Sequence, residues 1–393
     1  MRQRLFFTLG MASLAMATFG MKKPKAAIKP LNAATVQQPS YTEWHDLQVN
    51  AINRFPLHTN FFTYSPEDMV YEEGGKLVSR DLAQVNKTMS KNYLSLEGTW
   101  KFNWVENADQ RPTDFYKVDL DDSNWKPIIV PGNWEMYGYG VPEYVNVGFG
   151  WRGHFDEQPP AVPTKDNHVG SYRRIINIPE NWNGKQVVAH FGSVTSNIYL
   201  YVNGKFAGYA EDSKIAAEFD ITPYLKKGKN LIAFQTFRWC DGSWDEDQDF
   251  WRLSGVAREC YLFARDAKLH LEDIRVTPDL VNNYKDGVLH ISTKVKGIGK
   301  LNFILFDKEG KQVATATGLA KNGTANFTMN VENPHKWNAE TPYLYTLQVS
   351  LSSALKNGNE KSASITPVKV GFRKVEIKNK QFLVNGQPVL IKG

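Results

Sequence analysis

The stretch Ile198–Ala210, IYLYVNGKFAGYA, decides the fold. Two runs rich in aromatic and aliphatic residues flank Asn203-Gly204. This dipeptide is preferred in two-residue hairpin turns because both turn positions require a positive φ. The segment therefore predicts two antiparallel strands joined by a tight turn.

The chain around this hairpin has the same texture. Between residues 92 and 265 we find no 15-residue amphipathic helix, only short β-rich runs separated by Gly, Pro and Asn. Examples are LSLEGTWKFNW at 94–104, GSYRRIINIP at 170–179 and KQVVAHFGSV at 185–194. Residues 217–239 read as a strand, a turn with a short helical piece and another strand. Many short strands without helices predict a sandwich or barrel.

A second texture begins near Ala267. About six or seven alternating runs follow in the next 100 residues or so, a spacing typical of an immunoglobulin-like sandwich. From Glu376 a third piece begins, with another Asn-Gly hairpin in QFLVNGQPVLIKG. We expect its apolar residues Val389, Leu390 and Ile391 to lack a cover, as at the opening of a further domain.

The net charge of +6 is confined to the N-terminus, because residues 1–30 contain six basic residues and no acidic one. The remainder is neutral, which argues against a nucleic-acid-binding surface. A charged start, an apolar core and Ala15-Met16-Ala17 predict a signal peptide over 1–17, followed by a linker over 18–42. We expect a secreted protein in a bacterial periplasm, with no membrane span after signal cleavage.

The most unusual segment is FRWCDGSWDEDQDFWRLSGV, Phe237–Val256, which interleaves five acids with tryptophans. An EF-hand calcium loop is excluded, because Phe250 and Val256 occupy the positions that require Gly and Glu. A solvated run of charge is one interpretation. The other is sugar recognition, in which aromatic rings stack on a pyranose and carboxylates accept hydrogen bonds from its hydroxyl groups. Cys240 and Cys260 could form a disulfide or remain two buried thiols.

Six segments, taken in order, resemble consecutive motifs of the large bacterial β-galactosidases of glycoside hydrolase family 2. They are LSLEGTWKFNW, VPGNWEMYGYGVPEYVNVGFGW, SNIYLYVNGKFAGYAEDSKIAAEFDIT, DGSWDEDQDFWRLSGVAREC, NPHKWNAETPYLYTL and VGFRKVEIKNKQFLVNGQPVLIKG. The resemblance implies an all-β chain: a jelly-roll sugar-binding domain over 43–266 and an immunoglobulin-like sandwich over 267–375. Residues 376–393 would be the first hairpin of a (β/α)8 catalytic barrel that is otherwise absent.

The resemblance also implies two sites. Asp249, Asn146 and Val147 match residues at the galactose site, where Asp249 would also bind a sodium ion. A structural magnesium or calcium ion would be held by Asp241, Glu211, Glu43 and Asp46, with the backbone of Val49. The family often has Asp, Asn and Gln where this chain has Glu43, Asp46 and Glu211, so the identity of the metal stays open. The alternative for each residue is a solvated or loop-capping side chain.

Retaining glycosidases use two carboxylates, which this family carries as glutamates on the barrel. No position here matches them. We therefore expect this chain to be the sugar-binding and scaffold part of a secreted β-galactosidase, and to be inactive alone. We expect the full-length enzyme to bind β-galactosides and to form homo-oligomers. The alternatives are a free-standing galactoside-binding module, or a β-glucuronidase or β-mannosidase of the same family. His154 and His168 are weak candidates for a metal site.

Overall fold

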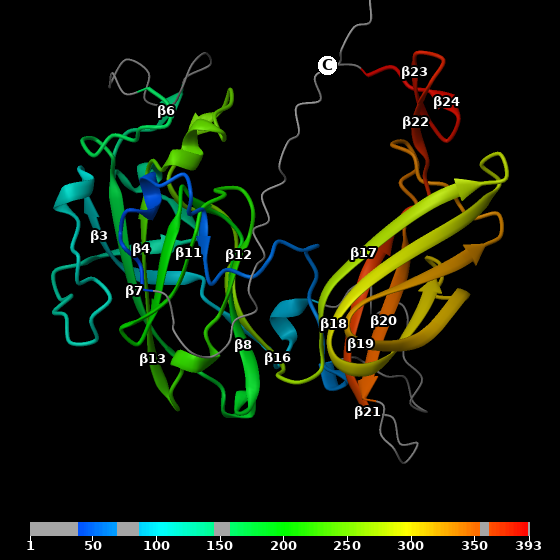
Figure 1. Ribbon diagram of the computed structural model, residues 1–393, viewed down its shortest axis with the longest axis horizontal. Helices are drawn as coiled ribbons and strands as arrows, with labels where there is room; N and C mark the ends of the chain where they lie inside the picture. The colour runs from blue at the N-terminus through cyan, green and yellow to red at the C-terminus, as the bar shows by residue number, and fades with distance from the viewer. Residues whose placement is uncertain (1–37, 69–85, 145–157, 354–360, 392–393) are drawn as a thin grey trace, which may run out of the picture. The chain divides into compact units, whose positions relative to one another are not determined.

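The computed structural model describes residues 38–68, 86–144, 158–353 and 361–391. Within these ranges every regular element is a β-strand or a short 3-10 helix (Figure 1), as the all-β prediction requires. None of the helices in the described ranges is long and apolar enough to cross a membrane. The 3-10 helices are η1 Glu43–His45, η2 Pro66–Asp68, η3 Lys87–Met89, η4 Ala108–Gln110, η5 Trp134–Tyr137, η6 Glu180–Trp182, η7 Thr222–Tyr224 and η8 Asp241–Trp244.

The first domain is a jelly-roll sandwich of two main sheets. The larger has the order β1-β11-β10-β13-β7-β3-β4, with β1 Ala51–Ile52, β3 Gly98–Val105, β4 Lys126–Val130, β7 Val169–Asn177, β10 Ile198–Val202, β11 Lys205–Ala210 and β13 Lys229–Phe237. The smaller has the order β12-β8-β16-β2, with β2 Tyr93–Ser95, β8 Lys185–Phe191, β12 Ala217–Asp220 and β16 Cys260–Asp266. One buried cluster draws on both sheets, for example Trp100 and Phe234 from the larger and Phe219 and Leu262 from the smaller.

The predicted hairpin is present. Strands β10 and β11 pair in antiparallel fashion, and Asn203 and Gly204 have φ values of 51° and 80°. The amide of Asn203 also donates to the carbonyl of Tyr224, at 2.8 Å. Tyr224 ends η7, which is the short helical piece expected from the sequence. The turn residue therefore fixes a neighbouring loop as well as its own backbone.

Part of the outer face of the larger sheet is covered. A second buried cluster there includes Trp44, Phe115, Tyr201 and Phe237, which come from the N-terminal segment, from the loop after β3 and from the sheet itself. Because these side chains lie outside the sandwich core, the sheet is buried on both faces over that part.

Short strand pairs at one end of the jelly-roll organise the acidic segment. Strand β14 Trp251–Arg252 pairs with β6 Glu143–Tyr144. Strand β15 Gly255–Val256 lies between β5 Gly132–Asn133 and β9 Val194–Thr195. The acidic segment is therefore held by strand pairing to loops from distant parts of the sequence.

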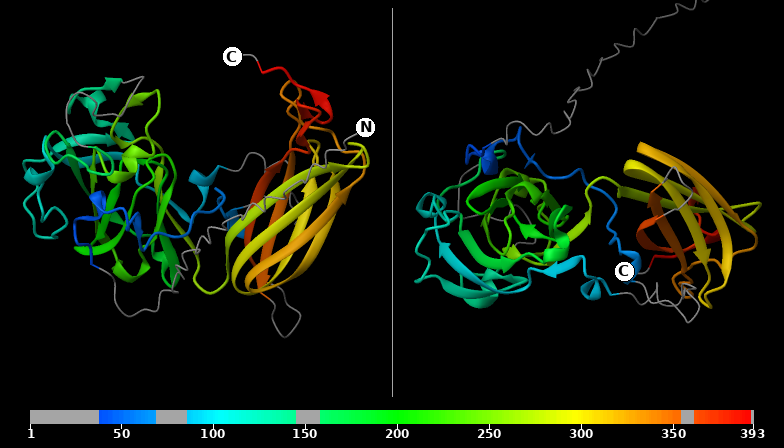
Figure 2. Two further views of the ribbon diagram at one scale, coloured as in Figure 1. Left: turned by 45° about the horizontal axis from the view of Figure 1, so that its top comes forward. Right: turned by 90° about the horizontal axis from the view of Figure 1, so that it is seen from below.

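The second domain is the immunoglobulin-like sandwich (Figures 1 and 2). Its strands are β17 His270–Val281, β18 Asp286–Phe306, β19 Gln312–Val331, β20 Tyr345–Ser353 and β21 Lys361–Val370. The expectation of six or seven strands was wrong, because runs that read as separate strands are continuous. The pairing of β18 with β19 shifts between Val295 and Ile298, where Gly297 has a φ of 87°. Such a bulge bends a strand without ending it.

The last described segment is a small sheet of β22 Val375–Lys378, β23 Gln381–Val384 and β24 Gln387–Pro388. Asn385 and Gly386 form its predicted turn, with φ values of 52° and 76°. Beyond it Leu390 and Ile391 are 79% and 78% exposed. The expected uncovered apolar end is therefore present.

Candidate functional site

The acids of the loop 241–249 divide into an inner and an outer set. Asp241 begins η8 and is buried beside Glu211, which directly follows β11. With Cys240 they form a group in which one ligand atom from each residue lies within 4.8 Å of the others. Residues on two separate segments thus meet in one buried cluster.

Burial disfavours the charged forms of both carboxyl groups in this cluster. Desolvation raises the pKa of Glu211 to about 8, although the hydroxyl of Tyr209 donates to its carboxylate at 2.6 Å, and the charge of Asp241 raises that pKa further. Desolvation also raises the pKa of Asp241, and the charge of Asp46 adds to the effect. A divalent cation would relieve this repulsion, and carboxylate oxygens suit Mg²⁺ or Ca²⁺. The two carboxylates, though not the Cys240 thiol, therefore fit the hard cation that the family resemblance implies.

The other two predicted ligands lie outside this group. Burial tends to raise the pKa of Glu43, but hydrogen bonds from Ser40 outweigh it and lower that pKa. The backbone N–H of Ser40 donates to Glu43 at 2.6 Å, and the hydroxyl of Tyr199 donates at 3.0 Å. Asp46 accepts from the backbone N–H of Gln48 at 3.0 Å. Both carboxylates cap local backbone or side chains in this structure, and Asp46 is close enough to Asp241 to influence its pKa.

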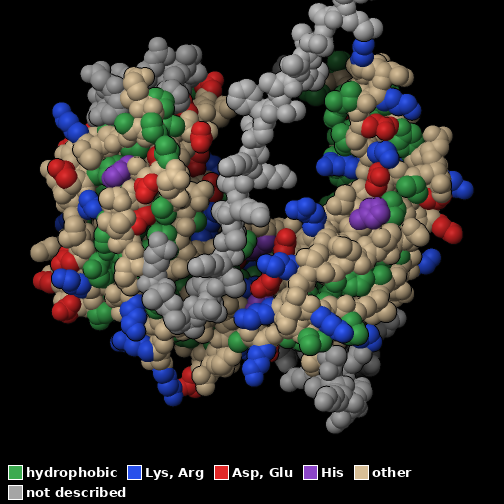
Figure 3. All heavy atoms as spheres, viewed as in Figure 1, with side chains coloured by type: hydrophobic (Ala, Val, Ile, Leu, Met, Phe, Trp, Pro, Cys, Tyr) green, Lys and Arg blue, Asp and Glu red, His purple; other side chains and the backbone are tan. Residues whose placement is uncertain are grey.

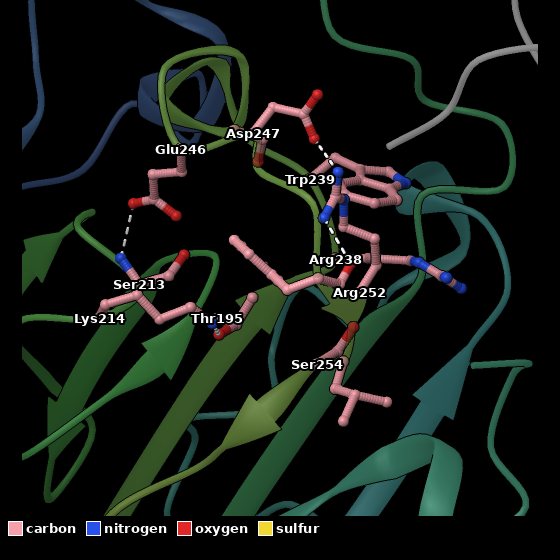
Figure 4. Close-up of a pocket in the computed structure, with 12 residues that line it drawn as sticks. Thr195, Ser213, Lys214, Arg238, Trp239, Glu246, Asp247, Arg252 and Ser254 are labelled. Carbon is pink, nitrogen blue, oxygen red and sulfur yellow. Dashed lines mark hydrogen bonds and ion pairs between the residues drawn. The ribbon is translucent and has the colours of Figure 1, made fainter. Parts of the chain in front are cut away.

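Two further acids hold the loop in place. Glu246 accepts from the backbone N–H of Ser213 at 2.7 Å, and Asp247 pairs with the buried guanidinium of Arg252 (Figure 4). Arg252 also donates to the carbonyl of Phe250 at 2.7 Å. Since one buried cation binds both backbone and carboxylate, the loop conformation is fixed from within.

Asp249 differs from these acids because it is exposed. The hydroxyl of Tyr144 donates to its Oδ1 at 2.5 Å. Tyr144 is the register partner of Trp251, and their rings lie 5.4 Å apart while remaining 51% and 57% exposed. An exposed carboxylate thus lies beside two exposed rings.

Asn146 and Val147, the other predicted sugar contacts, lie outside the described residues. They follow β6 directly in the sequence, and β6 is paired with the strand that follows Asp249. The described part of the chain therefore brings the segment leading to Asn146 next to the acidic loop.

A small cavity lies under the loop, lined by residues that include Thr195, Arg238 and Ser254 (Figure 4). Its volume is about 40 Å³. That is room for about one water molecule, which occupies roughly 30 Å³ in the liquid. It is too small to enclose a pyranose, and Asp249 is not among its lining residues.

The remaining candidate residues are two histidines and two cysteines, and those in the described ranges are buried. His168 is buried between Asp166, at 2.9 Å, and Arg238, at 3.1 Å, while His154 lies outside the described residues. Cys240 and Cys260 are both buried free thiols. On the face shown in Figure 3, basic and acidic side chains are interspersed rather than gathered in a basic stripe.

Two family models match the chain. One, described as glycosyl hydrolases family 2, sugar binding domain, matches residues 93–266, and the other, described as glycosyl hydrolases family 2, matches residues 269–373. The chain belongs to glycosyl hydrolase family 2. The two matched ranges contain the jelly-roll and immunoglobulin-like sandwiches respectively.

Curated relatives are named β-galactosidases. A β-galactosidase of Halalkalibacterium halodurans is 37% identical over 90% of this chain and 34% of the relative. One from Priestia megaterium is 35% identical over 91% of this chain and 34% of the relative. The chain thus spans about a third of the length of these curated relatives.

Solved glycosidase structures share the fold. A β-glucuronidase of Bifidobacterium dentium, in complex with coumarin-3-O-glucuronide, superposes with a TM-score of 0.60 at 19% identity, over 75% of this chain and 51% of that one. A β-glycosidase of Bacteroides vulgatus gives 0.58 at 24% identity, over 77% and 36%. At these identities the likeness concerns the fold alone.

Sequence reasoning missed three residues around the acidic loop. Tyr144 contacts Asp249, Arg252 fixes the loop, and Cys240 belongs to the buried acid cluster. Only Cys240 could have been suspected, since it adjoins Asp241. The roles of Tyr144 and Arg252 depend on strand pairing and on side-chain direction, which the sequence does not display.

Proposed function

We propose that this chain is the sugar-binding and scaffold part of a secreted β-galactosidase that releases terminal non-reducing β-D-galactose with retention of configuration. The proposal is supported by the names of the curated relatives, which are β-galactosidases and match most of the chain. The β-glucuronidase and β-mannosidase alternatives lack such support, because the glucuronidase likeness is limited to the fold.

The observation that carries the proposal is the placement of Asp249. Its carboxylate is exposed, is held by the Tyr144 hydroxyl, and lies beside the segment that leads to Asn146 and Val147. In the proposed site Asp249 accepts hydrogen bonds from galactose hydroxyls and binds a sodium ion, and Asn146 and Val147 contact the same sugar. A carboxylate already fixed by a hydroxyl loses little conformational freedom on binding.

A second cation, Mg²⁺ or Ca²⁺, is proposed at Glu211 and Asp241, with Asp46 and Glu43 nearby. Its contribution would be structural, because it neutralises acids that are buried beneath the loop. Glu211 and Asp241 hold it and Tyr209 orients Glu211, so the cation would tie the end of β11 to η8.

Hydrolysis with retention requires two carboxylates about 5–5.5 Å apart, one as nucleophile and one as acid and base. The proposal assigns both to a barrel domain outside this chain. The chain would then supply sugar contacts and loop scaffold to an active site that is completed by other residues, in an enzyme that we propose to be a homo-oligomer.

The test is an assay of a chromogenic β-galactoside with the chain alone and with a barrel fragment from a family 2 β-galactosidase. We expect no hydrolysis by the chain and restored hydrolysis in the mixture. A β-glucuronide and a β-mannoside serve as matched substrates, and preference for either would change the proposed specificity.

Calorimetry with galactose completes the test. We expect millimolar or weaker binding by the isolated chain, because most sugar contacts would come from the barrel. Micromolar binding without a barrel would instead favour a free-standing galactoside-binding module. Activity from the chain alone would contradict the assignment of the catalytic carboxylates.

A further inference from the structure

A groove lies on the outer face of the larger jelly-roll sheet, with no residue in common with the acidic loop. Its volume is about 590 Å³, within the range of about 300–1,000 Å³ typical of small-molecule sites. The lining residues come from β3, β4, β7, β13, the loop between β3 and β4, the β10–β11 turn and the loop before β13. They are Thr99, Trp100, Lys101, Val118, Asp122, Trp125, Pro127, Arg173, Arg174, Ile175, Asn203, Lys226, Lys229, Asn230 and Leu231.

The groove follows from strand geometry. Trp100 and Tyr172 point into the sandwich core, so their neighbours Lys101 and Arg173 point outward, where they are register partners. Two residues further along β7, Ile175 also points outward and is 65% exposed. The second buried cluster, which includes Phe115, covers the outer face elsewhere. It leaves an open apolar floor on the seven-stranded sheet.

The wall of the groove is aromatic and cationic. The half-buried ring of Trp125 lies 5.9 Å from the guanidinium of Arg173. The loop that carries Trp125 also carries Val118, a second exposed apolar side chain. A flat ring above an apolar floor suits a ligand with an apolar face, as sugar rings have.

The charge around the groove is strongly one-sided, with five basic side chains and one carboxylate among its described lining residues. That carboxylate, Asp122, is already neutralised by Lys101 at 2.5 Å and by Arg173 at 2.8 Å. Within the described ranges, no carboxylate lies at ion-pair distance from Lys226 or Lys229. The rim therefore presents cations that are free to meet an anionic ligand.

We propose that this groove binds an acidic oligosaccharide, a short chain of sugars bearing carboxylate or sulfate groups. Its sugar faces would lie over Ile175 and against Trp125, and its anionic groups would meet Lys226 and Lys229. The site is separate from the galactose site of Asp249, so it would hold an acidic glycan while a terminal galactose is cleaved elsewhere.

The experiment titrates the chain with trigalacturonic acid and with uncharged galactotriose, followed by calorimetry and NMR at 50 and 300 mM NaCl. We expect trigalacturonic acid to bind, and to bind several-fold more weakly at the higher salt, because screening lengths fall to about 6 Å or less. Galactotriose should bind at least about tenfold more weakly, since only the charged probe meets the rim lysines.

Variants locate the site. Lys226→Gln with Lys229→Gln should weaken binding of trigalacturonic acid by about 3- to 20-fold, as expected for two exposed charge contacts. Lys227→Gln is the matched control, because Lys227 is a neighbouring exposed lysine that does not line the groove. Ile175→Ser tests the floor at an exposed position where folding should not suffer.

Three results would overturn the proposal: no binding of trigalacturonic acid, equal binding of galactotriose, or equal losses from the Lys227 control and the groove variants. A sulfated trisaccharide tested in parallel separates carboxylate from sulfate preference. Galactose binding by the Asp249 site is measured on the same variants and should not change, so failure of either site can be told from failure of the other.

Discussion

The jelly-roll and the immunoglobulin-like domain are both antiparallel sandwiches, yet they bury different kinds of side chain. Among the described residues, every buried aspartate, glutamate and arginine lies in the jelly-roll: Glu43, Glu135, Arg173, Glu211, Glu218, Arg238, Asp241 and Arg252. The other core consists mainly of Leu, Ile, Val and Phe. Burying charge is unfavourable unless it is paired. The stability of the first domain therefore depends on the pairing of buried charges, and that of the second does not.

Two buried glutamates of the jelly-roll show how partners decide the outcome. Burial tends to raise the pKa of Glu218, but His190 at 2.8 Å and His58 at 2.9 Å outweigh it and lower that pKa to about 2. Burial raises the pKa of Glu211 to about 8, and the charge of Asp241 adds to the effect. One carboxylate has two histidine partners, and the other has a tyrosine hydroxyl and a second acid beside it.

The largest expected effect is that of Glu218→Gln. One pKa unit corresponds to about 1.4 kcal/mol. Lowering the pKa from 4.5 to about 2 therefore stabilises the fold by about 3 kcal/mol near neutral pH. Because the folded-state pKa is depressed, this stabilisation is present above pH 4.5 and is lost as pH falls towards 2. Urea unfolding at pH 7 should show the loss.

The matched control for that prediction is Glu272→Gln in the immunoglobulin-like domain. Glu272 lies 3.4 Å from Lys294, whose side chain is half exposed. A pair of this kind contributes about 0.2–1 kcal/mol. Equal losses from Glu218→Gln and Glu272→Gln would show that burial of charge does not distinguish the two domains.

The next effect concerns the paired buried acids Glu211 and Asp241. Since the pKa of Glu211 is raised from 4.5 to about 8 in the folded state, the metal-free jelly-roll should lose stability as pH rises through that range. Mg²⁺ or Ca²⁺ at a hundredfold excess over its Kd should restore about 2.7 kcal/mol. That corresponds to about 5–10 °C in the Tm of a domain of this size. Calorimetry at pH 8 with and without the cation measures it.

Two controls sharpen the cation prediction. Glu211→Gln removes one of the paired acids, so it should stabilise the metal-free protein at pH 8 and abolish the response to the cation. The thermal unfolding transition of the immunoglobulin-like domain is an internal reference for that of the jelly-roll. Desolvation lowers the pKa of the buried His270 in the immunoglobulin-like domain to about 4. His270 is therefore neutral in both the folded and the unfolded state above pH 6.5, and it adds no pH dependence to the stability of this domain at pH 8. A cation response in that transition would point to non-specific binding.

The features that the sequence could predict are those that depend on the local backbone. The turn at Asn203-Gly204 follows from two residues that tolerate positive φ, and so does the turn at Asn385-Gly386. The strand count of the immunoglobulin-like domain could not be predicted, because the bulge at Gly297 looks like a strand end. The meeting of Glu211 with Asp241 joins residues 30 positions apart, and only family resemblance suggested it.

A smaller effect separates the exposed acids of the loop. In an enzyme restored with a barrel, Asp249→Asn should lower kcat/KM by about 10- to 150-fold, the value of a lost charge-assisted hydrogen bond of about 1.5–3 kcal/mol. Asp245→Asn should change it by less than about twofold, because Asp245 is exposed and surface charges contribute little. Equal effects would remove Asp249 from the proposed galactose site.

The smallest expected effect on folding lies at the other end of the chain. Leu390→Ser combined with Ile391→Ser should shift neither thermal transition by more than about 2–4 °C, because changes at exposed positions are usually within about 0.5 kcal/mol. Light scattering should nevertheless fall, since β24 is the edge of a three-stranded sheet and exposed apolar edges promote association. The matched control is Leu383→Ser, a buried position on the neighbouring strand β23, which should lower stability. If the double variant lowers a Tm as much as Leu383→Ser does, Leu390 and Ile391 pack against the fold. Exposed apolar surface would then not distinguish this end of the chain from the two sandwiches.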